Sequence, residues 1–190
     1  MTKYLRLLLL ITTVTISGCG SFLATLQTST IEDNPGQRTL GQQLDDESIE
    51  TKAVVNIHSA DSAFDEVHLI VVSYNGYVLI AGQVRSDALK AKATQVVREI
   101  RGVRRIYNEL EISAPSSAMT RTSDTWITAK VKSWLLGSSN IEGGRVKVVT
   151  ENGVVYLMGL ATNAEAGRVA ESASDTAGVQ RVVRLFELID

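Results

Sequence analysis

Two stretches of the chain carry the same pattern of apolar and polar positions. Each has two β-rich apolar runs separated by an Asn-Gly dipeptide, namely 67–74 with 77–84, and 146–150 with 154–160. Asn-Gly tolerates the positive φ angles of a type I′ turn, so each pair of runs predicts an antiparallel hairpin. A helical pattern precedes each hairpin, and a second helix and a last strand follow it. The predicted order in each stretch is therefore α-β-β-α-β.

The second helix of each stretch has recognisable ends. Thr162-Asn-Ala-Glu165 is a capping box, and the helix that it begins is expected to stop at Gly178. Its counterpart runs from Ser86 to Gly102. The recurring glycines Gly82, Gly102, Gly159 and Gly178 are interpreted as turns and helix stops rather than as a phosphate-binding loop.

The two stretches are copies of one small domain. Asn75 and Asn152 lie 77 residues apart, Gly82 and Gly159 also 77, and Gly102 and Gly178 lie 76 apart. We place the first domain at 45–112, a linker at 113–123 and the second domain at 124–190. The fold class is α+β, with a three-stranded mixed sheet packed on two helices in each domain. Domains this small bury only about 60% of their unfolded surface, so the copies are expected to pack together or stay close.

The amino terminus resembles a lipoprotein signal sequence. Lys3 and Arg6 precede an apolar run at 7–16, and about ten residues are too few to span a bilayer. The run ends in Ile16-Ser-Gly-Cys19, which resembles the bacterial lipobox. We expect a signal peptide at 1–18, a lipidated Cys19 and a flexible tether over 19–44. The alternative of Cys19 as a buried core thiol is disfavoured by its two flanking glycines.

The lipobox resemblance also implies a location. Lipoprotein sorting in bacteria with two membranes retains proteins that have Asp just after the lipidated cysteine, whereas Gly20 and Ser21 follow Cys19 here. The resemblance therefore implies the outer membrane, periplasmic face, with the protein anchored by lipid.

Composition and charge exclude several functions. The net charge of −2 gives no basic excess for nucleic acid, and a single cysteine excludes a disulfide framework. His58 and His68 fit no common ligand spacing and are interpreted as surface histidines, so no metal is expected. No nucleophile motif is present, so we expect no catalysis, no cofactor and no small-molecule substrate. Asp46 and Asp124 are expected in the first turns of their helices, where the helix dipole favours a carboxylate.

These features together resemble the outer-membrane lipoproteins with two BON domains. The resemblance covers about Asp45 to Asp190 and the lipobox. Its most specific parts are Asp124-Thr-Trp-Ile-Thr-Ala-Lys-Val-Lys132 and Thr150-Glu-Asn-Gly-Val-Val-Tyr-Leu-Met-Gly-Leu160. It implies a periplasmic, non-enzymatic protein that binds anionic phospholipid, gathers at the division site and supports envelope integrity.

The first helices of the two domains differ on their outer faces. At about 100° per residue, Ile127, Val131, Trp134 and Leu135 form the expected core stripe, and Trp126 and Leu136 point away from it. Ser48 and His58 occupy the two outward places in the first domain. An outward indole with lysines at its edge suits a lipid headgroup layer. The predicted phospholipid-binding residues are Trp126, Ala129, Lys130, Lys132, Ser133 and Leu136.

Two alternatives stay open. Trp126 could pack on the sister domain or its linker, where Met119 could cover the indole. A basic edge of Arg104, Arg105, Arg181 and Arg184 with Tyr107 could instead bind a protein partner or a glycan. The protein would then be a periplasmic interaction scaffold for outer-membrane assembly, division or cell-wall machinery.

Overall fold

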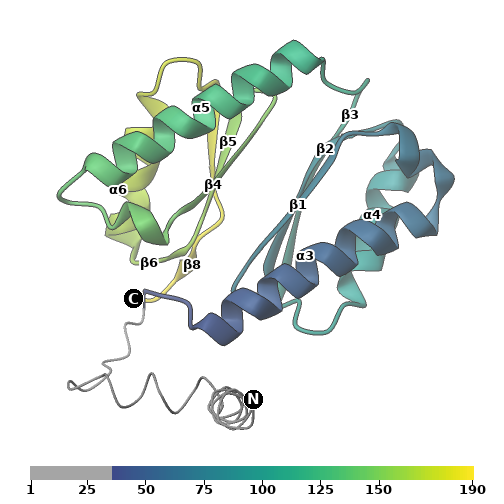
Figure 1. Cartoon of the computed structure of the whole chain (residues 1–190), viewed down its shortest axis with the longest axis horizontal. Helices are drawn as coiled ribbons and strands as arrows, with labels where there is room; N and C mark the ends of the chain where they lie inside the picture. The colour runs from purple at the N-terminus through teal and green to yellow at the C-terminus, as the bar shows by residue number, and fades with distance from the viewer. Residues whose placement is uncertain (1–35) are drawn as a thin grey trace, which may run out of the picture. The chain divides into compact units, whose positions relative to one another are not determined.

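The computed structural model describes residues 36–190, which form two α-β-β-α-β domains (Figure 1). The expected signal peptide, Cys19 and the tether up to residue 35 lie outside the described residues. The first domain contains α3 (Leu40–Ala60), the 3-10 turn η2 (Ser62–Glu66), β1 (Leu69–Tyr74), β2 (Tyr77–Val84), α4 (Asp87–Arg98) and β3 (Arg105–Ile112). The second contains α5 (Ala118–Gly137), the 3-10 turn η3 (Gly143–Arg145), β4 (Lys147–Glu151), β5 (Val154–Met158), β6 (Leu160–Ala161), α6 (Asn163–Ser174), β7 (Arg181–Arg184) and β8 (Glu187–Leu188).

Each domain has the predicted three-stranded mixed sheet. Strand β2 pairs antiparallel with β1 and parallel with β3, and β5 pairs in the same way with β4 and β7. In the second domain the chain bends at Gly159, after which β6 and β8 form a separate two-stranded ladder. The α+β prediction is confirmed, with both helices of each domain on one face of its sheet (Figure 1).

The Asn-Gly turns have the predicted backbone. Asn75 and Asn152 have φ angles of 52° and 50°, and the glycines that follow them have φ angles of 75° and 74°. Two successive positive φ angles are the signature of a type I′ turn, whose twist matches that of the flanking strands. The capping box at Thr162 is likewise present, and its hydrogen bonds from the Thr162 backbone and hydroxyl lower the pKa of Glu165.

Both first helices begin earlier than the sequence predicted. Helix α3 begins at Leu40 because Thr39 forms a capping box with Gln42, so residues 40–44 are helical rather than tether. Helix α5 begins at Ala118, inside the expected linker, and is capped by the Ser117 hydroxyl. The expectation that Asp46 and Asp124 lie in the first turns of their helices was therefore wrong.

Asp46 and Asp124 instead lie about two turns into their helices and are buried. Asp46 accepts hydrogen bonds from the backbone N–H groups of Asn75 and Gly76, at 2.7 and 2.9 Å. Asp124 accepts the equivalent pair from Asn152 and Gly153, both at 2.9 Å. Each carboxylate thus fastens a hairpin turn to the first helix of its domain.

The two domains pack through the sheet faces that their helices leave uncovered. This interdomain core includes Leu79 from the first sheet and Tyr156 and Met158 from the second, all at most 2% exposed. Burial at this interface raises the pKa of the Tyr156 phenol to about 12. The expectation that the copies pack on one another is confirmed. The packing stabilises both domains, because each small domain buries a second apolar face of its sheet.

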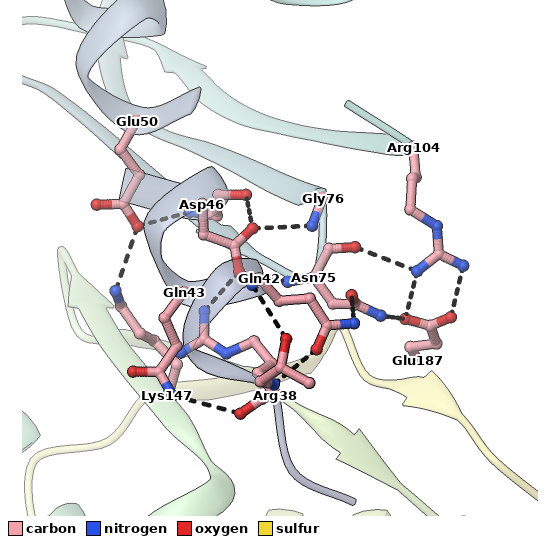
Figure 2. Close-up of polar contacts among 12 residues, drawn as sticks. Arg38, Gln42, Gln43, Asp46, Glu50, Asn75, Gly76, Arg104, Lys147 and Glu187 are labelled. Atoms are coloured by element: carbon pink, nitrogen blue, oxygen red, sulfur yellow. Dashed lines mark hydrogen bonds and ion pairs between the residues drawn. The ribbon is translucent and has the colours of Figure 1, made fainter. Parts of the chain in front are cut away.

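Polar side chains also join the two domains, and Figure 2 shows the contact between Arg104 and Glu187. Arg104 makes two hydrogen bonds to the Glu187 carboxylate, at 2.9 and 2.6 Å, which raise the pKa of its guanidinium. The sequence defined no acidic partner for this arginine, because β8 follows a bend that brings Glu187 from the other domain. Gln83 donates to Glu151 at 2.7 Å, and His68 lies 3.2 Å from the same carboxylate. Arg104 and Glu187 therefore belong to the interface between the domains.

Candidate functional site

Helix α5 has one buried face and one exposed face. The buried face consists of Asp124, Ile127, Val131 and Leu135, spaced three or four residues apart. Ile127, Val131 and Leu135 pack in the core of the second domain with Val155 and Leu157 of β5. This spacing fixes the rotation of the helix and so determines which side chains face solvent.

Four large apolar side chains of α5 are exposed outside its buried face, and we call them the α5 ridge. Met119 is 83% exposed, Trp126 and Leu136 are each 68% exposed, and Trp134 is 67% exposed. Single exposed apolar residues are common, but several on one helix mark a surface that contacts another phase or molecule. The ridge is the largest such feature of this helix and the first candidate for function.

Trp134 corrects the prediction, which placed it in the core stripe. It lies on the flank of α5 that faces α6, where a covering helix could have buried it. The α6 residue that lies near the indole is Ser172, whose small side chain leaves the ring uncovered. Trp134 instead borders a cavity of about 430 Å³ that Gly137, Ile141 and Ser172 also line.

The six residues predicted to bind phospholipid are all exposed on α5. Lys130 lies between Trp126 and Trp134 around the helix, and its ammonium donates to the Ala177 carbonyl at 2.6 Å. Lys132 lies on the opposite flank, nearer Leu136. The alternative in which Met119 or the sister domain covers Trp126 is contradicted, since both side chains are largely exposed.

The matching helix of the first domain is different but not fully polar. Ser48 and His58, the counterparts of Trp126 and Leu136, are polar but half-buried, so they are less exposed than the two residues that they match. However, α3 also exposes four aliphatic side chains, and two of them, Leu40 and Leu44, lie in residues 40–44, which the sequence assigned to the tether. The capping box formed by Thr39 and Gln42 was the signal in the sequence that α3 begins at Leu40. The four aliphatic side chains are Leu40, Leu44, Val54 and Val55.

The basic edge is partly used inside the protein. The Arg104 guanidinium is bound by Glu187, and that of Arg105 lies 5.3 Å from the Tyr77 ring centre and 6.0 Å from that of Tyr107. Tyr107 itself packs against the interdomain core. This edge therefore serves the contact between the domains in part. Arg105, Arg181 and Arg184 are exposed, and Arg104 is exposed as well although Glu187 binds its guanidinium.

The described residues show neither a spanning helix nor a metal site. Within residues 36–190, no helix is both long and apolar enough to cross a membrane. In the same part of the chain, no three His, Cys, Asp or Glu side chains are placed to hold a metal ion. His58 lies 3.5 Å from Asp65, and His68 contacts Glu151.

Comparison with known proteins agrees with this architecture. The model of the BON domain matches residues 45–114 and 123–190. The chain therefore belongs to the BON-domain family.

Relatives in other bacteria narrow the class further. The chain is 37% identical to the outer membrane lipoprotein DolP of Haemophilus influenzae, over 80% of this chain and 79% of that protein. It is 34% identical to the 21 kDa hemolysin of Actinobacillus pleuropneumoniae, over 80% and 78% of the two chains. Osmotically-inducible protein Y of Escherichia coli is 25% identical over 95% of this chain and 94% of that protein. The protein is thus an outer-membrane lipoprotein of the BON family.

Proposed function

We propose that the second BON domain docks this lipoprotein on anionic phospholipid through the α5 ridge. The observation that carries the proposal is the exposure of Trp126, Trp134 and Leu136 on one helix beside Lys130. Indole rings partition into the headgroup layer, and ammonium groups are attracted to lipid phosphate. The function is that of a binding protein without catalysis, and it would place the protein at membrane regions rich in anionic lipid, such as the division site, in support of envelope integrity.

The magnitudes favour a weak contact that a tether strengthens. Burying the ridge side chains contributes a few kcal/mol, and each lysine near an anionic surface about 1 kcal/mol. The acidic net charge of the chain opposes this attraction. We propose that Cys19 carries the lipid anchor, which lies about 20 residues before the helix cap Thr39. A linker of this length gives an effective concentration in the millimolar range, so weak docking becomes lipid-selective.

Replacing Trp126 by Glu is expected to weaken vesicle binding at least tenfold. A carboxylate at this position cannot enter the headgroup layer and repels anionic lipid. Binding is measured by co-sedimentation with vesicles of graded phosphatidylglycerol content, using residues 19–190 with Cys19→Ser so that the anchor does not contribute. Because Trp126 is 68% exposed, the melting temperature should stay within a few degrees of the parent value.

The first domain offers a matched control. Ser48 occupies the position of Trp126 on α3, so Ser48→Glu adds the same charge at the equivalent place. It should leave vesicle binding unchanged. Equal binding by the Trp126→Glu and parent chains, or a loss of binding that follows a large loss of stability, would contradict the proposal.

A protein-interaction scaffold is the second candidate function. The observation in its favour is the exposed aliphatic set on α3, which includes Leu44 and Val55. Since α3 and α5 cover opposite outer faces of the paired sheets, a docked second domain leaves α3 free for an envelope-assembly or division protein (Figure 1). Absence of vesicle binding by the parent chain at every phosphatidylglycerol content would favour this second candidate.

A further inference from the structure

A small cavity lined by cations lies where the two domains meet. It has a volume of about 260 Å³, and Arg38 and Tyr74 of the first domain line it together with Gly144, Arg145 and Lys147 of the second. Arg38, Arg145 and Lys147 supply three positive charges, and among residues 36–190 the carboxylates that pair with them do not themselves line the cavity. We call it the interdomain basic cavity. Figure 2 shows that Arg38 and Lys147 reach this place from different parts of the chain.

Each of the three cations is held in position by a carboxylate. The Arg38 guanidinium donates to Asp46 at 2.6 Å, Lys147 to Glu50 at 3.2 Å, and Arg145 pairs with Glu142. The Arg38 guanidinium also lies 3.7 Å from the centre of the Tyr74 ring, a stacking that leaves its N–H edge free to donate. Side chains fixed in this way lose little further conformational entropy when they bind a ligand.

Donors remain available after these contacts. Arginine has five N–H donors and lysine three, and among the described residues the Nε–H of Arg145 is buried without a hydrogen-bond partner. A buried donor of this kind costs free energy until an acceptor reaches it. Burial raises the pKa of Tyr74 against the opposing effect of Arg38 and Arg145, so its hydroxyl stays protonated. The Glu142 carboxylate is 61% exposed, so its pair with Arg145 exchanges at little cost.

We propose that the interdomain basic cavity binds a phosphate group through Arg38, Arg145 and Lys147. Three cationic side chains around one small cavity suit a compact anion with several acceptor oxygens, such as phosphate. The cavity can hold a phosphate or a phosphoglycerol group, but not a nucleotide with its base. Because Arg38 belongs to one domain and Arg145 and Lys147 to the other, the bound anion would tie the domains together. This site is separate from the α5 ridge.

Phosphate titration of the full-length chain in dodecyl maltoside tests the proposal. We expect saturable NMR shifts at the Gly144 amide and the Arg145 Nε–H when sodium phosphate replaces sodium chloride at constant ionic strength. Arg145→Gln and, as a milder change, Lys147→Gln should each weaken phosphate binding about tenfold, the value of one charge-assisted hydrogen bond. Arg98→Gln, an exposed arginine of α4, removes the same charge and should leave phosphate binding unchanged.

Two further arms identify the source of the phosphate. Glycerol 3-phosphate added in solution reports a free ligand, and phosphatidylglycerol added to the micelles reports a lipid headgroup. Saturable shifts with any of the three probes that Arg145→Gln weakens support the site. The proposal would be overturned if none of the three probes caused shifts. It would also be overturned if the shifts in the Arg145→Gln and Lys147→Gln chains were as strong as in the parent chain. A Trp126→Glu chain should keep the response to free phosphate, so this test does not depend on the α5 ridge.

Discussion

Replacing Asp46 by Ala is expected to destabilise the first BON domain by about 3–5 kcal/mol. The carboxylate is 2% exposed and accepts hydrogen bonds from the Ser73 hydroxyl at 2.6 Å and from two backbone N–H groups of the hairpin turn. Alanine leaves those buried donors unpaired and also removes the partner of Arg38. Losing one member of a buried charged network costs more than losing a surface contact. Urea unfolding followed by circular dichroism measures the loss.

The neighbouring residue gives a matched control. Asp45 is exposed, so Asp45→Ala should change stability by no more than about 0.5 kcal/mol. Asp124→Ala should have a smaller effect than Asp46→Ala, because Asp124 accepts from the two turn N–H groups but not from a strand hydroxyl. Similar losses for Asp45→Ala and Asp46→Ala would show that the carboxylate does not fasten the turn.

The stabilising effect of Asp46 should disappear in acid. Burial raises the pKa of this carboxyl, but hydrogen bonds from Ser73, Gly76, Arg38 and Asn75 outweigh burial and leave it below the ordinary value of 3.8. A lowered folded-state pKa means that the unfolded chain binds more protons at low pH, so stability falls as the pH falls below 3.8. The stability difference between the parent and Asp46→Ala chains should be constant near neutral pH and narrow below pH 3.8.

Local features were predictable where a few adjacent residues determine the structure. The dipeptides at Asn75 and Asn152 require positive φ angles, and the cap at Thr162 needs only the Glu three residues later. The rotation of α5 was mostly predictable as well, because its inward residues repeat every three or four positions. Trp126 and Leu136 are exposed for this reason.

Features that depend on a neighbouring element could not be predicted from a single helix. The exposure of Trp134 depends on the small size of its α6 neighbour Ser172, and the partner of Arg104 comes from the other domain. The interdomain basic cavity also needs both domains, since Arg38 and Arg145 are more than 100 residues apart in the sequence. Leu40 and Leu44 of α3 were assigned to the tether because the capping box at Thr39 was not recognised.

Replacing Gly82 by Ala is expected to cost about 3–5 kcal/mol. The sequence interpreted this glycine as a turn, but it lies inside β2 with a φ angle of 125°, which residues with a side chain rarely adopt. A Cβ atom there would lie 2.0 Å from the His68 carbonyl oxygen, which accepts a hydrogen bond from the Gln83 N–H. The added methyl group must therefore displace strand backbone, which cannot move without breaking the ladder between β1 and β2.

Gly167→Ala makes the same chemical change and should have the opposite effect. Gly167 lies inside α6, and a Cβ atom there would meet no atom within 4 Å. Alanine is the better helix former, so this variant should gain about 0.5–1 kcal/mol. Urea midpoints of the two variants and the parent chain test both values. Both changes add one methyl group, so stability changes of opposite sign would show that the loss in Gly82→Ala comes from the His68 carbonyl and the backbone angle. A loss of stability in both variants would contradict this explanation.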